Sequence, residues 1–111
     1  KISGFDSQEL ANTLWALAKL NHDPGEDLLN AILAETRAKI FCFDSQDLAT
    51  TLWALATLDR NPGDDMLNIM LAEISAKIFS FSSQNLANTL WALGKLDHNP
   101  GEDLLSVMLT E

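Results

Sequence analysis

The sequence of 111 residues lacks the features that mark secreted and membrane proteins. Its one cysteine, Cys42, cannot form a disulfide within the chain, and a reducing compartment is therefore favoured. No apolar run approaches the roughly 18 residues that a membrane-spanning helix requires. The first residues, Lys1-Ile2-Ser3-Gly4, have neither the apolar stretch nor the cleavage pattern of a signal peptide. These absences predict a chain without membrane insertion.

Basic residues are also scarce, since seven Lys and Arg accompany 16 Asp and Glu and the net charge is -9. Proteins that bind nucleic acid normally present a basic surface, so this balance argues against an RNA partner. Much of the acidity nevertheless has a structural explanation, because the helix dipole favours negative charge at caps and first turns. Eleven of the sixteen acids occupy such predicted positions: Asp6, Glu9, Asp23, Glu26, Asp27, Asp44, Asp47, Asp64, Asp65, Glu102 and Asp103.

An internal repeat of 38 residues runs through the whole chain. A fixed period in this range is the sequence signature of stacked helical repeats. The phase predicts the tail of a preceding repeat at 1–4, repeats at 5–42 and 43–80, and a third repeat with a truncated second helix at 81–111. We therefore expect one domain that is an excerpt from a longer array. The residues that recur are Phe5, Phe43 and Phe81; Trp15, Trp53 and Trp91; Pro24, Pro62 and Pro100; Gly25, Gly63 and Gly101.

Each repeat is predicted to begin with a helix from about Ser7 to Leu20. Asp6 and Glu9 form a potential capping box, in which each side chain bonds the backbone N–H of the other residue. Phe5 before the cap suits a hydrophobic staple to the fourth helical position. Apolar residues then recur at helical spacing and predict one buried stripe. The stripe consists of Leu10, Ala11, Leu14, Leu17 and Ala18.

A second helix is predicted after Asp23, with Pro24 at its first position and Glu26 at its third. Its apolar face is formed by Leu29, Ile32, Leu33, Thr36 and Ile40. A single hairpin cannot bury two apolar stripes, so neighbouring units must stack and bury them together. The sequence therefore predicts an all-α fold, a right-handed α-solenoid of antiparallel helical hairpins.

The repeated phrase resembles the octotricopeptide repeat family over essentially the whole chain. It appears as FDSQELANTLWALAKL, FDSQDLATTLWALATL and FSSQNLANTLWALGKL, followed each time by a proline that opens the second helix. The resemblance implies an α-solenoid related in design to the pentatricopeptide repeats, in proteins of chloroplasts or mitochondria that support RNA processing, stability or translation. Some family members are structural parts of organellar ribosomes. One departure is Asp27, which stands where the family often has tryptophan.

A polar face is expected on the first helices, because their positions outside the apolar arc cluster on one side of the helical wheel. In helical-repeat readers of RNA, two or three side chains per repeat address one base, so three repeats would address about three nucleotides. The same residues also suit contacts with a protein partner or plain solvation, and the residues alone leave these alternatives open. The candidate contact residues are Glu9, Asn12, Thr13, Lys19, Asp47, Thr50, Thr51, Thr57, Asn85, Asn88, Thr89 and Lys95.

Other residue types with chemical potential receive structural interpretations. Trp15 falls at the edge of the apolar stripe, which predicts core packing for the tryptophans. His22 and His98 lie in loops without further metal ligands and are expected to be exposed. Cys42 is interpreted as a small packing residue. Thr13 is expected to bond a backbone carbonyl of its own helix.

Catalysis is not expected, because nearly every polar residue has a counterpart one period away and an active site needs a unique constellation. The sequence shows no phosphate loop, catalytic triad or cofactor motif. Two functions remain open. One is an organellar module that binds single-stranded RNA, and the other is a protein-binding or architectural solenoid within a larger assembly. A designed consensus array is disfavoured because the repeats differ at many positions.

Overall fold

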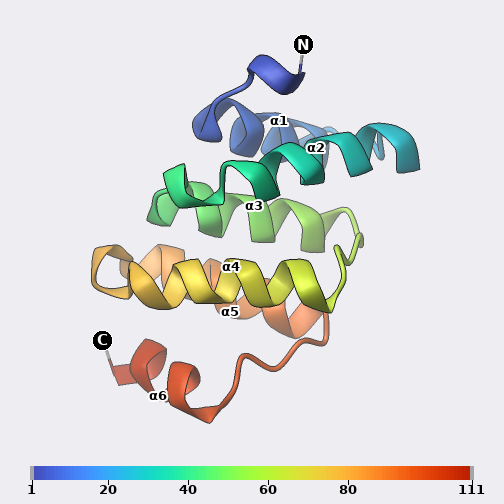
Figure 1. Cartoon of the computed structure of the whole chain (residues 1–111). Coiled ribbons are helices and arrows are strands. Elements are labelled where there is room, and N and C mark those ends of the chain that lie inside the picture. Colours follow the sequence, from blue (N-terminus) through green and yellow to red (C-terminus); the bar gives the residue numbers. More distant parts are fainter. Residues whose placement is uncertain (1, 111) are drawn as a thin grey trace.

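The 38-residue period appears in the structure as three stacked helical hairpins (Figure 1). The structure is a computed structural model that describes residues 2–110, so that Lys1 and Glu111 of the predicted terminal segments lie outside it. The all-α prediction is confirmed for the described residues. The α-helices are α1 (Ser7–Lys19), α2 (Glu26–Ala38), α3 (Ser45–Thr57), α4 (Asp64–Ala76), α5 (Ser83–Lys95) and α6 (Glu102–Thr110). Three short 3-10 helices precede the first helices: η1 (Ile2–Gly4), η2 (Ile40–Cys42) and η3 (Ile78–Ser80).

The first helix of each hairpin begins where its capping residues place it. In α1, the Glu9 N–H donates to the Asp6 carboxylate at 2.8 Å, and the Asp6 N–H donates to the Glu9 carboxylate at 2.9 Å. Asp44 and Asp47 form the same capping box in α3. These reciprocal bonds satisfy backbone donors that the first turn leaves without partners. The predicted start of the first helix is confirmed, and its last residue is Lys19, with Leu20 as the C-cap.

The second helices begin two residues later than the sequence suggested. The Asp23 side chain accepts the Gly25 N–H at 2.8 Å and thereby forms a turn that keeps Pro24 outside the helix. Gly25, with φ of +93°, is the N-cap, a conformation that a side chain would strain. The prediction that Asp23 caps the helix and Pro24 opens it is therefore wrong. Ile40, expected on this helix, is buried in the 3-10 helix that follows.

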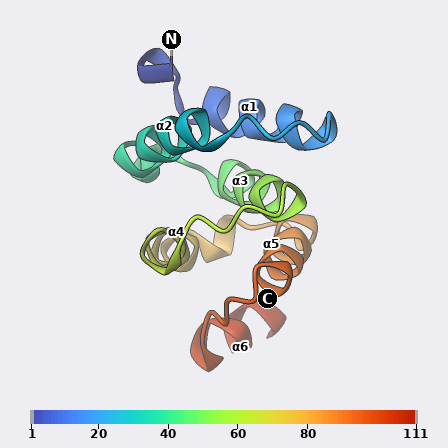
Figure 2. The same ribbon diagram turned by 90° about the vertical axis from the view of Figure 1, so that its right-hand side faces the viewer.

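The helices form two layers (Figure 2). Helices α1, α3 and α5 lie on one side of the molecule, and α2 and α4 lie on the other. The closest helix pairs are α1 with α3 and α3 with α5. The α2 and α4 helices approach each other less closely than α1 and α3 do. Fully buried side chains fill the space between the layers: Leu10, Leu14, Ile32, Phe43, Leu48, Leu52, Leu55, Leu67, Met70 and Ile74.

Two basic side chains connect one repeat to the 3-10 helix of the repeat before it. Lys39 donates to the backbone carbonyl of Ser3 at 3.0 Å and also bonds that of Phe5. Lys77 donates in the same way to the carbonyls of Phe41 and Phe43. Carbonyl groups at the junctions where the first and second repeats begin therefore receive a charge-assisted partner 34 or 36 residues further along the chain. The repeated lysine thus bonds a carbonyl of the preceding segment and the first carbonyl of its own repeat.

A third connection joins the loops of the first two repeats. Arg60 donates two hydrogen bonds to the Asp23 carboxylate, at 2.6 and 2.9 Å, and a third to Glu26 at 2.6 Å. Arginine and carboxylate match in this two-pronged geometry, which makes the pair stronger than a single contact. The Arg60 guanidinium lowers the pKa of Asp23 to about 2, with further help from the Gly25 N–H.

Replacing the central tryptophan tests how much the stacking of three repeats stabilises the chain. Trp53 packs against the core and has a repeat on each side, whereas Trp15 is 46% exposed. We expect Trp53→Ala to lower the free energy of unfolding by about 3 kcal/mol, and Trp15→Ala to lower it by about half of that or less. Urea denaturation of both variants measures the difference. Equal losses would contradict the central role of Trp53.

A pH series tests the loop connection between Arg60 and Asp23. Because folding lowers the Asp23 pKa to about 2, the carboxylate stabilises the fold above its ordinary pKa of 3.8, and this contribution disappears as the pH falls toward 2. Asp23→Asn removes the charge but keeps the turn, since Asn61 accepts the Gly63 N–H at 2.8 Å in the second repeat. We expect the variant to have a lower melting temperature than the parent protein at neutral pH. The difference between the two melting temperatures should disappear as the pH is lowered. A difference independent of pH would refute the ion pair.

Candidate functional site

A hollow of about 260 Å³ crosses all three first helices on their free face. It lies where these three helices pack side by side. Each of α1, α3 and α5 contributes two residues from different parts of its length, so the hollow runs diagonally across the layer. The lining residues are Trp15 and Lys19, Thr50 and Trp53, and Gln84 and Asn88.

The lining residues belong to one helical face. Gln8, Asn12, Trp15 and Lys19 are spaced by four, three and four residues, which places them on the same side of α1. The corresponding residues of α3 and α5 repeat this face. The sequence interpretation missed the glutamine, of which Gln84 lines the hollow. Its signal was present, because a polar residue recurs unchanged at an exposed helical position in all three repeats.

The tryptophans depart from the expected core packing. Trp15 and Trp91 are 46% and 48% exposed, and Trp53 is half-buried. The prediction fails at the two outer positions because each of these rings has a neighbouring repeat on one side only among the described residues. The Lys19 ammonium lies 5.8 Å from the centre of the Trp15 ring, within the range of a cation–π interaction. An aromatic surface and a cation therefore meet at one end of the hollow.

The candidate contact residues divide into those that face the hollow and those that do not. Thr50, Asn88 and Lys19 line it. Asn12 and Lys95 are exposed on the same helical face outside the hollow, and Thr57 is half-buried. The Thr57 hydroxyl has no hydrogen-bond partner among the residues that the structure describes.

Two further ladders serve the fold. Thr13 donates to the Glu9 carbonyl at 2.7 Å, which confirms the expected backbone bond. Its counterparts Thr51 and Thr89 are fully buried, so packing against neighbouring helices removes them from any accessible surface. In the remaining ladder, the Glu9 and Asp47 side chains belong to capping boxes, whereas Asn85 donates only its backbone N–H, to the Ser82 hydroxyl at 3.0 Å. Its members are Glu9, which is exposed, Asp47, which is 8% exposed, and Asn85, which is half-buried.

The carboxylates among the described residues do not line the hollow. Its lining includes one lysine and no carboxylate. The acids gather instead at the helix N-termini, and Asp6, Asp44 and Asp47 line a polar groove of about 280 Å³ between the starts of α1 and α3. Burial raises the pKa of the Asp47 carboxyl, and the neighbouring Asp44 charge adds to this effect. The acidic groove adjoins the hollow, because Thr50 lines both, but the lining of the hollow itself, within residues 2–110, has a lysine as its one charged residue.

Comparison with known protein families shows to which family the chain belongs. The family described as Tbc2 translation factor, N-terminal domain, matches residues 1–108. The chain belongs to this family. No curated protein matches it. The match to the Tbc2 N-terminal domain family includes every residue that lines the hollow.

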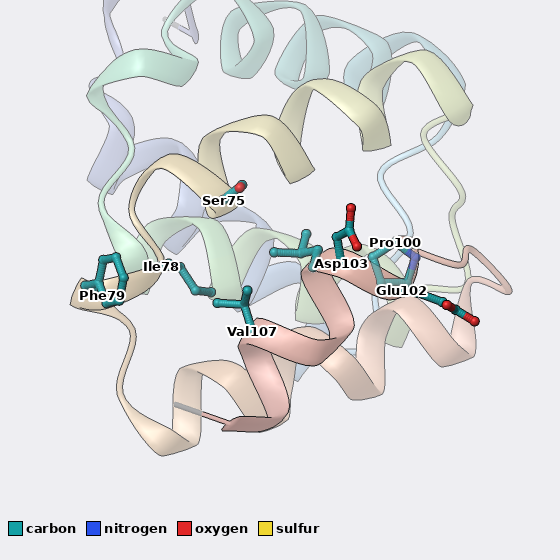
Figure 3. A pocket seen from close by; sticks show the side chains of 9 residues that line it. Ser75, Ile78, Phe79, Pro100, Glu102, Asp103 and Val107 are labelled. Atoms are coloured by element: carbon teal, nitrogen blue, oxygen red, sulfur yellow. The ribbon is translucent and has the colours of Figure 1, made fainter.

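A larger cavity of this Tbc2-family chain lies in the other layer (Figure 3). It has a volume of about 610 Å³ and separates the end of α4 and η3 from α6. Ile78 and Val107 approach each other across it, whereas Glu102 points away (Figure 3). Phe79, at its edge, is 84% exposed. This cavity contacts the last repeat junction only, so it offers no surface that runs along the stack.

The remaining chemically active residues of this family member assemble no further site. Cys42 is exposed, which contradicts the packing interpretation, because the 3-10 helix turns its side chain outward. His22 is exposed, but His98 is half-buried, with Nδ1 3.4 Å from Asp64 and Nε2 3.3 Å from Asn68. Stacking on the preceding repeat covers His98, so the expected exposure is wrong there. Within residues 2–110, no cluster of metal ligands occurs, and no helix is long and apolar enough to traverse a bilayer.

Proposed function

We propose that this chain is a non-catalytic module that binds single-stranded RNA along the hollow of its first helices. The observation that carries the proposal is the composition of this hollow. The ring of Trp15, which is 46% exposed, and the half-buried ring of Trp53 lie there among amide, hydroxyl and ammonium groups, and no carboxylate among the described residues lines the hollow. This combination suits a single strand, which presents base faces, base edges and phosphates to one surface.

Each group of the hollow has a complementary part of an RNA strand. The Trp15 and Trp53 rings provide stacking surfaces for bases, and such stacking is worth about 1–3 kcal/mol per base. The Gln84 and Asn88 amides carry both donors and acceptors and can bond the edges of unpaired bases. Lys19 provides a cation for a phosphate next to the Trp15 ring. The hollow therefore accommodates a short segment of single strand across the three repeats.

The family supports a role of this binding in translation. The matching family is described as the N-terminal domain of a translation factor, and a translation factor that binds transcripts needs an RNA-binding surface. The repeat phrase, with its likeness to octotricopeptide repeats, extends the proposal to RNA processing or stability in a chloroplast or mitochondrion. Both arguments favour RNA over other linear ligands.

A protein-binding or architectural role is the second candidate function, favoured by the opposite layer. The cavity beside α6 is lined by Ile78, Leu104 and Val107, and Phe41 and Phe79 are 80% and 84% exposed. Exposed aromatic side chains at repeated positions are typical of surfaces that contact another protein. This surface lies away from the hollow, so both functions are compatible in one chain.

Two tryptophans form a matched pair for testing RNA binding. Trp15 and Trp91 have nearly equal exposure, 46% and 48%, but only Trp15 lines the hollow. We expect Trp15→Ala to weaken binding to labelled single-stranded RNA by about tenfold, as expected for the loss of one stacked base, and Trp91→Ala to have a much smaller effect. Fluorescence anisotropy measures both affinities. Equal effects of the two changes would exclude the hollow as the binding site.

The lysines provide a second matched pair. Lys19 lines the hollow, whereas Lys95 occupies the same position of α5 outside it. We expect Lys19→Gln to weaken all strands alike and to reduce the slope of log affinity against log salt concentration by about 0.7, the value for one phosphate contact on a single strand. Lys95→Gln should leave the slope unchanged. If the parent protein binds no strand more tightly than a non-specific polyanion at low salt, the RNA proposal is refuted.

A further inference from the structure

We infer that each base-binding subsite is built across a junction between repeats. It pairs the tryptophan of one repeat with the polar residue 35 positions further along the chain, in the next repeat. The pairs are Trp15 with Thr50 and Trp53 with Asn88. This inference rests on the proposed RNA binding and states which side chains determine the preference for a base.

The diagonal course of the hollow carries the inference. Both pairs are present in it completely, Trp15 with Thr50 and Trp53 with Asn88. The alternative, in which every repeat reads one base with its own residues, would pair each tryptophan with the residue three positions before it. Only Trp53 and Thr50 satisfy that alternative within the hollow.

The two residues left out of the hollow exclude a subsite within each outer repeat. Asn12 precedes Trp15 by three positions, and both Asn12 and Thr50 line the acidic groove between the starts of α1 and α3. Of these two residues, only Thr50 also lines the hollow. Trp91 follows Asn88 by three positions, yet only Asn88 lines the hollow. The hollow brings the middle of α3, with Thr50, beside the later part of α1, with Trp15, and it brings the earlier part of α5, with Asn88, beside the middle of α3.

The two junctions differ in their polar residue, and they should therefore differ in selectivity. The Asn88 amide has a carbonyl acceptor and an NH₂ donor, so it can bond two neighbouring atoms of one base edge. The Thr50 hydroxyl is a single rotatable group and can satisfy several base edges equally. We expect a strong preference for one base at the Trp53 junction and a weaker preference at the Trp15 junction.

Three substitutions at equivalent positions of the three repeats test this assignment: Asn12→Thr, Thr50→Asn and Asn88→Thr. The probe is a pool of single-stranded RNA oligomers with randomised positions, and bound strands are sequenced. Asn88→Thr should reduce the dominant base preference by about tenfold, the discrimination of one bidentate contact. Thr50→Asn should create, at a second position of the bound strands, the same base preference that Asn88 produces in the parent protein. Asn12→Thr is the matched control and should leave the bound pool unchanged.

A double-mutant cycle distinguishes subsites that cross a repeat junction from subsites that lie within one repeat. If subsites cross the junction, Asn88→Thr combined with Trp53→Phe has a non-additive effect on affinity, whereas Asn88→Thr combined with Trp91→Ala is additive. Phenylalanine at position 53 retains an aromatic ring against the core. The reverse result, or a changed preference in Asn12→Thr, would overturn the junction assignment while RNA binding stands. Absence of specific binding in the parent protein would overturn both proposals.

Discussion

The packing of α3 against both α1 and α5 is the constraint on which the rest of the structure depends. Single hairpins cannot bury their apolar stripes, so the middle helix is covered from two sides, and even Asp47 and Thr51 are buried on it. Alanines such as Ala49, Ala54 and Ala56 provide the small side chains that let the helices approach. The hollow lies across these three closely packed helices, whereas the larger cavity lies between α4 and α6, on the side of the second helices.

The same packing gives identical residues different environments. The three tryptophans of the repeated phrase range from half-buried at Trp53 to 48% exposed at Trp91. Thr13 bonds the backbone of its own helix at a partly covered position, whereas Thr51 is fully buried without a hydrogen-bond partner among the described residues. Position along the stack therefore determines which copies of a residue remain available to a ligand. Function in such a chain depends on the junctions as much as on the repeated unit.

The acidic composition and the proposed RNA surface are compatible because many of the charged side chains have structural roles elsewhere in the fold. Acids such as Asp6 and Asp44 cap helices, where the dipole stabilises them, and Asp23 joins two loops through Arg60. Lys39 and Lys77 bond backbone carbonyls of the preceding repeat and are therefore engaged within the fold. The hollow itself has no carboxylate, which leaves its aromatic and amide groups accessible to a polyanion. Local charge, and not net charge, is the relevant quantity for this face.

The sequence by itself determined the features that depend on neighbours along the chain. The helical class and the Asp6–Glu9 capping box follow from contacts three or four residues apart, and helical periodicity and capping motifs report such contacts reliably. The tertiary structure decided the rest, including the exposure of Trp15 and the burial of His98. Exposure depends on which helix of another repeat covers a side chain, and a helical wheel of one repeat contains no information about that neighbour. For the same reason, the polar face of the first helices was predictable from the sequence. Which residues of that face line the diagonal hollow was not predictable.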